Sequence, residues 1–145
     1  STISLAVSLS FVPLLIGLAG NVGNQTATII VRGMATDVIK GSSSMTILVR
    51  EVAVGTVLGA ILGAVVTGTL IVFQQSQALA IIVGVSIWVT MTVATLLGGV
   101  LPILFRKCSI DPAVASAPFI STTLDIVGQL IYFALSLLLL YQLLV

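Results

Sequence analysis

A single carboxylate, Asp125, lies in the middle of the apolar stretch PFISTTLDIVGQLIYF. Polar and small residues recur around it every three or four positions, the spacing that gathers side chains on one face of a helix. This stripe consists of Pro118, Thr122, Asp125, Gln129 and Tyr132, with Ser121 and Gly128 beside it. Since a charged Asp at the centre of a membrane helix costs roughly 2.5–3.5 kcal/mol on insertion scales, Asp125 needs something to compensate its charge.

Three kinds of compensation are open to Asp125: protonation, a water-filled cavity or a bound cation. All five basic residues lie near the ends of apolar segments, so none of them is a buried partner. The surrounding donors are hydroxyls of Ser121 or Thr122 and backbone carbonyls freed near Pro118, and hard oxygens of this kind suit Mg²⁺, Ca²⁺ or Na⁺. Mg²⁺ keeps several waters and uses one or two carboxylates, so one Asp per chain, doubled across a two-fold axis, fits that ion. The structural alternative is a neutral Asp125 hydrogen-bonded inside the bundle.

A second polar stripe runs along an early segment of the chain. It consists of Pro13, Gly17, Asn21, Asn24 and Thr28, with Gly20 and Gln25 adjacent. Asn24 and Asp125 each lie about a dozen residues from the end of the segment that carries basic residues, which is ~20 Å at ~1.5 Å per residue. We therefore predict one shared polar site near mid-membrane. Its pore-lining residues would be Asn21, Asn24, Thr28, Pro118, Thr122 and Gln129. The alternative is that these side chains only hold helices together.

The composition indicates a membrane protein. Of the 145 residues, 59% are hydrophobic and 6% are charged, whereas soluble domains carry about 25% charged residues. Four segments reach the ~20 residues of a membrane helix, and they run roughly over Ile3–Ala35, Met45–Phe73, Ala78–Leu104 and Pro112–Leu144. We predict an all-α polytopic membrane helix bundle that forms a single transmembrane domain over residues 1–145. The short breaks make consecutive helices antiparallel neighbours.

A row of small residues in the second segment predicts close helix packing. Gly55, Gly59 and Gly63 recur every four residues and are followed by Thr67. This spacing puts them on one face, where they let another helix approach closely. We interpret the row as structural.

The basic residues set the orientation. They are Arg32, Lys40 and Arg50 around the first loop, and Arg106 and Lys107 in the third loop, whereas the second loop carries no charge. By the positive-inside rule the first and third loops are cytoplasmic and the C-terminus lies outside, in a protein integral to the plasma (inner) membrane.

Asp111 precedes Pro112 at the start of the last segment, which is typical of a helix N-cap. The alternative reading of Asp111 is a cation site at the cytoplasmic mouth.

Several function classes are disfavoured. Cys108 is the only cysteine and the chain has no histidine, which excludes an intrachain disulfide and argues against zinc sites of the usual kind. No nucleophile–base pair or phosphate loop is present, so we do not expect an enzyme. The chain contains no run of basic residues, so we do not expect a nucleic-acid partner.

The chain starts without Met beside an apolar segment, and we expect it to be a piece of a longer protein.

The two polar segments resemble a known family. FVPLLIGLAGNVGNQTATIIVRGMAT resembles the second membrane helix of the MgtE family of magnesium channels and transporters, and DPAVASAPFISTTLDIVGQLIYF is similar to its fifth. The resemblance implies a homodimer in the lipid membrane, with Mg²⁺ as the bound and transported ion and a pathway lined by these two helices of each protomer. It also implies a first transmembrane helix and cytoplasmic magnesium-sensing domains outside these residues.

The resemblance also implies roles for individual residues. Asp125, followed by Gly128, corresponds to the family's intramembrane aspartate that binds the ion. Ser121 and Ala117 lie one and two turns earlier on the same helix, at positions that help to hold the hydrated ion. Family members often carry Asn or another small residue at the latter position. Ala117 has no side-chain oxygen, so a contact there would run through the backbone or a water.

The leading hypothesis is the pore domain of a divalent-cation channel or transporter, with a hydrated cation between the paired Asp125 carboxylates of a homodimer. The alternative is a proton- or sodium-coupled cation carrier in which Asp125 is the protonatable group. A third hypothesis is an assembly module whose polar stripes only join helices.

Overall fold

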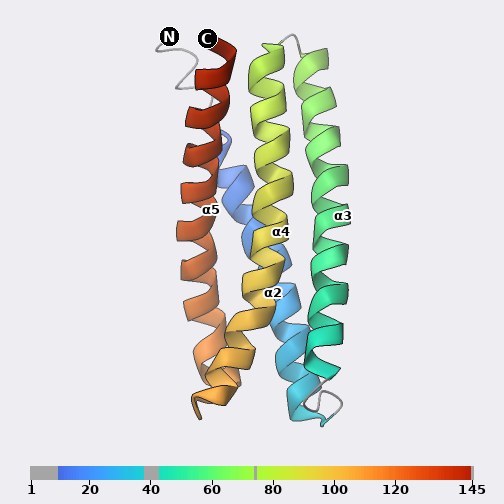
Figure 1. Ribbon diagram of the computed structural model, residues 1–145, viewed down its shortest axis with the longest axis vertical. Coiled ribbons are helices and arrows are strands. Elements are labelled where there is room, and N and C mark those ends of the chain that lie inside the picture. Colours follow the sequence, from blue (N-terminus) through green and yellow to red (C-terminus); the bar gives the residue numbers. More distant parts are fainter. Residues whose placement is uncertain (1–9, 38–42, 74, 145) are drawn as a thin grey trace.

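The structure, a computed structural model, describes residues 10–37, 43–73 and 75–144, with side-chain surroundings for all of these except 43, 113–117 and 139–144. These residues form four long helices: α2 (Val12–Ala35), α3 (Ser43–Val72), α4 (Gln77–Lys107) and α5 (Pro112–Leu144). Each contains a stretch long and apolar enough to cross a membrane. Figure 1 shows α3, α4 and α5 side by side, with α2 slanting behind α4. The predicted all-α bundle of four membrane helices is confirmed.

Two helix boundaries differ from the prediction. Ser10 and Phe11 form a turn and α2 begins at Val12, so the predicted start at Ile3 is wrong where it covers this turn, and the rest of that prediction lies outside the described residues. Pro13 occupies the first turn of α2, where its missing N–H removes no helical hydrogen bond. At the other end of the bundle, α4 continues past Leu104 to Lys107, because basic residues in its last turn favour the negative end of the helix dipole.

A tight turn joins α4 to α5 and makes them antiparallel. The Ile110 N–H donates to the Phe105 carbonyl at 2.9 Å and the Ser109 N–H donates to the Arg106 carbonyl at 3.2 Å. Ser109 has a φ of 59°. This left-handed conformation after the end of α4 lets the following N–H groups hydrogen-bond to the last carbonyls of the helix. Asp111 then occupies the position before Pro112, the first residue of α5, as predicted for an N-cap.

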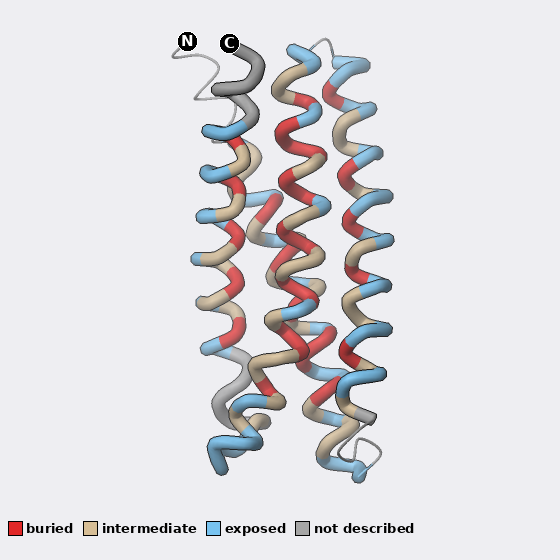
Figure 2. The backbone as a smooth tube through the Cα atoms, in the orientation of Figure 1, coloured by how far each residue is buried: buried red, intermediate tan, exposed pale blue. Residues whose placement is uncertain are grey.

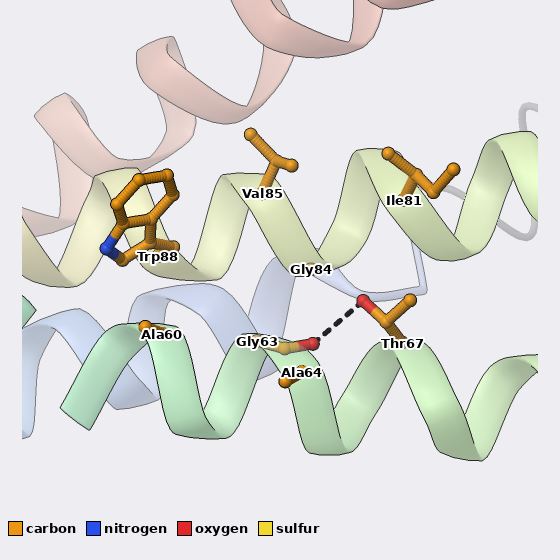
Figure 3. Close-up of a pocket in the computed structure, with 8 residues that line it drawn as sticks. All are labelled: Ala60, Gly63, Ala64, Thr67, Ile81, Gly84, Val85 and Trp88. Atoms are coloured by element: carbon orange, nitrogen blue, oxygen red, sulfur yellow. Dashed lines mark hydrogen bonds between the residues drawn. The ribbon is translucent and has the colours of Figure 1, made fainter. Parts of the chain in front are cut away.

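The row of glycines on α3 packs against α4, as predicted. A Cβ at Gly59 would lie 3.1 Å from the Trp88 carbonyl oxygen, and one at Gly63 would touch the backbone of Gly84. Thr67 donates a hydrogen bond to the Gly63 carbonyl at 2.8 Å, and Figure 3 shows both residues beside Gly84 in a hollow of about 320 Å³ between the two helices. Small residues therefore let the α3 and α4 backbones meet.

Helix α4 is the centre of the bundle, and its face toward α2 is as closely packed as its face toward α3. It carries buried positions from Ala80 to Pro102, through most of its length (Figure 2). A Cβ at Gly98 would collide with the Gly23 carbonyl of α2, and a Cβ at Gly23 would lie 3.0 Å from the Ala94 carbonyl. The α2 and α4 backbones therefore cross in contact.

Helix α5 closes the other side of this crossing. Its Ile120 and Leu124 are 0% and 1% exposed in one cluster with Ala19, Ala27 and Ala94. Burying these two side chains fixes the rotation of α5 about its axis. Ser121 and Asp125, the next residues along the helix, are consequently only half-buried at the edge of the packed face.

Candidate functional site

The two predicted polar stripes meet in a direct hydrogen bond. Asn24 Nδ2 on α2 donates to Ser121 Oγ on α5 at 3.0 Å, and Ser121 Oγ lies 3.5 Å from Asn24 Oδ1. These residues are 97 positions apart in sequence. The contact confirms that the two stripes lie at the same height, which equal distances from the basic ends of the helices had predicted.

Asp125 lies one helical turn beyond the bonded Ser121. Because α2 and α5 run antiparallel, Asn21 lies one turn from Asn24 in the same direction along the bundle. Asp125 is half-buried and makes no hydrogen bond or ion pair with the described residues. The acceptor capacity of its carboxylate is therefore unused within this part of the chain, one helical turn from the Asn24–Ser121 hydrogen bond.

The polar stripe of α2 lies on the outside of the four-helix unit. Asn21, Asn24, Gln25, Thr28 and Ile29 line a hollow of about 570 Å³. Asn21, Gln25 and Thr28 are exposed, whereas the packed face of the helix carries buried residues. These three predicted or adjacent polar residues therefore lie outside the interior of the described bundle.

The remaining predicted pore residues on α5 lie on the same kind of surface. Pro118, Thr122 and Gln129 are exposed. The Thr122 hydroxyl donates to the Pro118 carbonyl at 2.9 Å, and the Thr28 hydroxyl on α2 donates to the Asn24 carbonyl at 2.8 Å. These hydroxyl hydrogens are thus used within their own helices, and each oxygen keeps acceptor capacity toward the outside.

Two other predicted residues, Gly128 and Asp111, lie away from this surface. Gly128 is buried, and a Cβ there would lie 3.3 Å from Thr90 Cγ2 and 3.9 Å from Ala19 Cβ. Asp111 is exposed at the α4–α5 turn, far along α5 from Asp125. The side-chain surroundings of Ala117 lie outside the described residues, although its backbone belongs to α5.

Tyr132 corrects the predicted stripe on α5. It is 1% exposed and belongs to an apolar cluster with Leu15, Val83 and Ile87. Tyr132 lies four residues after the buried Gly128, so it continues the packed face of the helix. A spacing of three or four residues drifts around the helix, and the stripe at this point has already passed from the open face to the packed one.

The chemistry of the site is that of one carboxylate among neutral oxygens. The described residues contain no group of three or more His, Cys, Asp or Glu side chains that could hold a metal. Within one chain, Ser121 lies one helical turn from Asp125 on α5, and Ser121 is hydrogen-bonded to the Asn24 amide of α2. Such donors suit a hard cation that keeps part of its water shell.

The Asn24–Ser121 hydrogen bond can be tested by a double-mutant cycle. We expect Asn24→Ala and Ser121→Ala to couple by about 0.6 kcal/mol, and by no more than about 1.7 kcal/mol, as for other interhelical hydrogen bonds in membranes. Unfolding in detergent gives the four free energies. The matched control pairs Asn24→Ala with Thr123→Val, because the Thr123 hydroxyl donates within its own helix to Phe119. Equal coupling in both cycles would contradict the assigned bond.

Comparison with known proteins gives the family. The family model MgtE, described as a divalent cation transporter, matches residues 12–135. The chain is 38% identical over 123 residues to the magnesium transporter MgtE of Enterococcus faecalis, covering 85% of the chain and 27% of that protein. It is 37% identical over 130 residues to that of Thermus thermophilus, covering 90% and 29%, respectively. It is 30% identical over 126 residues to that of Bacillus subtilis, covering 87% and 28%.

The chain thus spans less than a third of the length of these relatives. The matched region runs from the start of α2 far into α5 and includes both polar stripes. Since the family model covers most of the residues, this chain belongs to the MgtE family of divalent cation transporters.

Proposed function

We propose that the chain forms half of a pore for divalent cations, with Mg²⁺ as the preferred ion, and that two copies of the chain enclose it. The observation that carries this proposal is the outward-facing polar strip, by which we mean the exposed Asn21 and Thr28 of α2 and Thr122 and Gln129 of α5, together with the half-buried Asp125. Amides and a carboxylate cannot be left against lipid, so they face protein or a water-filled path. A second copy related by a two-fold axis would cover the strip with the same strip and bring the two Asp125 carboxylates together.

The paired carboxylates would act mainly through their charge. Two negative charges in a partly desolvated path attract a doubly charged ion more strongly than a singly charged one, because the Coulomb energy scales with the ion's charge. Mg²⁺ loses its water reluctantly, so the ion would pass largely hydrated, its waters donating to Asp125 and to the oxygens of Asn21 and Asn24. Ser121 and Ala117 are the further positions that the family resemblance assigns beside the ion, Ala117 through its backbone or a water. Gly128, which was also predicted at the metal site, is buried against Thr90 and Ala19.

The orientation of the pore is part of the proposal. The end of the bundle that carries the α2–α3 and α4–α5 connections also carries the basic residues Arg32, Arg50, Arg106 and Lys107. By the positive-inside rule this end faces the cytoplasm. Ions entering the cell would then pass Asp125 before reaching the basic end.

Flux through the purified chain in proteoliposomes tests the proposed function. We expect Mg²⁺ to enter along its own gradient at equal pH on both sides and without sodium, as measured by a trapped Mg²⁺-sensitive dye. Empty liposomes are the control. Flux that requires a proton or sodium gradient would instead support a coupled carrier with Asp125 as the protonatable group. An intact dimer without any flux would support the assembly-module alternative.

A further inference from the structure

A second polar hollow lies at the basic end of the bundle, away from Asp125. It has a volume of about 410 Å³ and is formed by the ends of three helices. Its lining consists of Met34 of α2, Ser44 and Met45 of α3, and Ile103, Arg106 and Lys107 of α4. It therefore combines two cationic side chains and a hydroxyl with an apolar wall.

The cationic side chains of this hollow are unneutralised by the described residues. Arg106 and Lys107 are exposed, and neither makes an ion pair or hydrogen bond through its side chain within the part of the chain that the structure describes. The first turn of α3, which supplies Ser44 and Met45, contains no acidic residue, so no carboxylate of that turn offsets the positive end of the helix dipole. Asp37, Glu51 and Asp111 are the acidic residues of this end of the chain, and none of them lines the hollow.

We propose that this hollow binds the phosphate-bearing headgroup of an anionic phospholipid. Arg106 offers a planar fork of donors that matches phosphate oxygens, and Lys107 adds a mobile point charge. Basic pockets between membrane helices at the cytoplasmic side are recognised sites for acidic headgroups. The hydroxyl of Ser44 supplies a further donor to phosphate.

The apolar half of the lining selects a lipid over a free phosphate. Met34 and Ile103 are half-buried and Met45 is 64% exposed. These side chains lie next to the cations at the ends of membrane-spanning helices, where an acyl chain leaves its headgroup. Met also adapts its shape to irregular apolar partners. A soluble anion would leave this wall uncovered, whereas a phospholipid covers both halves.

Lipid binding to charge-matched variants tests the site. The purified chain is titrated with phosphatidylglycerol and with phosphatidylcholine, as wild type, as Arg106→Gln with Lys107→Gln, and as the control Arg32→Gln with Arg50→Gln. The control removes the same charge at the same end of the bundle from residues that do not line the hollow. We expect phosphatidylglycerol affinity to fall about fivefold for each lining charge removed, and less in the control pair. An equal fall in both pairs, or equal wild-type affinity for the two lipids, overturns the proposal.

A reporter inside the hollow keeps the test decisive if the double variant fails to fold. Trp88 is the only tryptophan of the chain, so Met45→Trp combined with Trp88→Phe places one fluorophore in the lining. Phosphatidylglycerol with brominated acyl chains is expected to quench it at lower mole fractions than brominated phosphatidylcholine. Equal quenching by both lipids contradicts the site. Binding of glycerol phosphate as tight as that of phosphatidylglycerol contradicts the lipid assignment.

Discussion

Asp125→Asn is expected to lower the affinity for Mg²⁺ by about ten- to a hundredfold and to reduce Mg²⁺ flux accordingly. The change removes the charge from the only carboxylate in the middle of a predicted membrane segment and, in a two-fold dimer, removes it twice. Hydrogen bonds to charged groups are worth about 1.5–3 kcal/mol, and every 1.4 kcal/mol is tenfold in affinity. The waters of the hydrated ion would lose charged acceptors while amide oxygens of similar size remain.

The fold is expected to survive this substitution. Asp125 makes no hydrogen bond or ion pair with the described residues, and Asn has nearly the same volume. Calorimetric titration with Mg²⁺, Ca²⁺ and Mn²⁺ and dye-based flux measure the effect. The control is Glu51→Gln, the same change from carboxylate to amide. Glu51 is half-buried like Asp125 but belongs to α3, a helix that packs against α4 and carries none of the predicted pore-lining residues. Unchanged Mg²⁺ binding and flux in Asp125→Asn would show that Asp125 does not bind the ion.

Gly98→Ala is expected to destabilise the bundle by about 3 kcal/mol, at the upper end of the range for overpacked interiors. The added methyl would meet the Gly23 carbonyl oxygen and lie 2.8 Å and 2.9 Å from the Gly23 C and Cα atoms. All three neighbours are backbone atoms, so no side-chain rotation can make room and the α2 and α4 helices must separate. Because α2 carries Asn24, we also expect the Asn24–Ser121 contact to be disturbed and flux to fall.

Gly68→Ala is the matched control for this prediction. Gly68 is in α3, and a Cβ there would have no atom within 4 Å. The same substitution should therefore stabilise the protein by roughly 0.5–1 kcal/mol through helix propensity alone. Thermal unfolding in detergent distinguishes the two. Equal effects of Gly98→Ala and Gly68→Ala would contradict the close crossing of α2 and α4.

Much of the fold follows from local features of the sequence. The hydropathy of the four segments predicts their number, and Asp111 followed by Pro112 marks the start of α5 at the residue observed. The start of α2 was predicted too early because an apolar run does not reveal where a helix begins. Pro13, which suits a first helical turn, was the available signal for it. Arg106 and Lys107 looked like loop residues, although they suit the last turn of α4.

The candidate site was predictable in part. Equal depth along antiparallel helices brought the Asn24 and Ser121 regions together correctly. Periodicity alone could not tell which face of α5 packs, since that depends on Leu124 docking against Gly23 of another helix. Tyr132 was misassigned for this reason. The outward position of the polar strip also follows from tertiary packing. Glycines on α2 and α3 let both helices pack closely against α4, so the polar residues of α2 are left on the opposite, outer face.

The central position of α4 separates the residues that stabilise the chain from those that line the proposed ion path. The buried residues of the bundle gather around α4, whereas Asn21, Thr122 and Gln129 are exposed and outside that core. Substitutions on this strip therefore change few packing contacts within the chain. In evolutionary terms, a substitution around the proposed ion path needs no compensating change in the core, so selection for ion preference and selection for stability act on different residues.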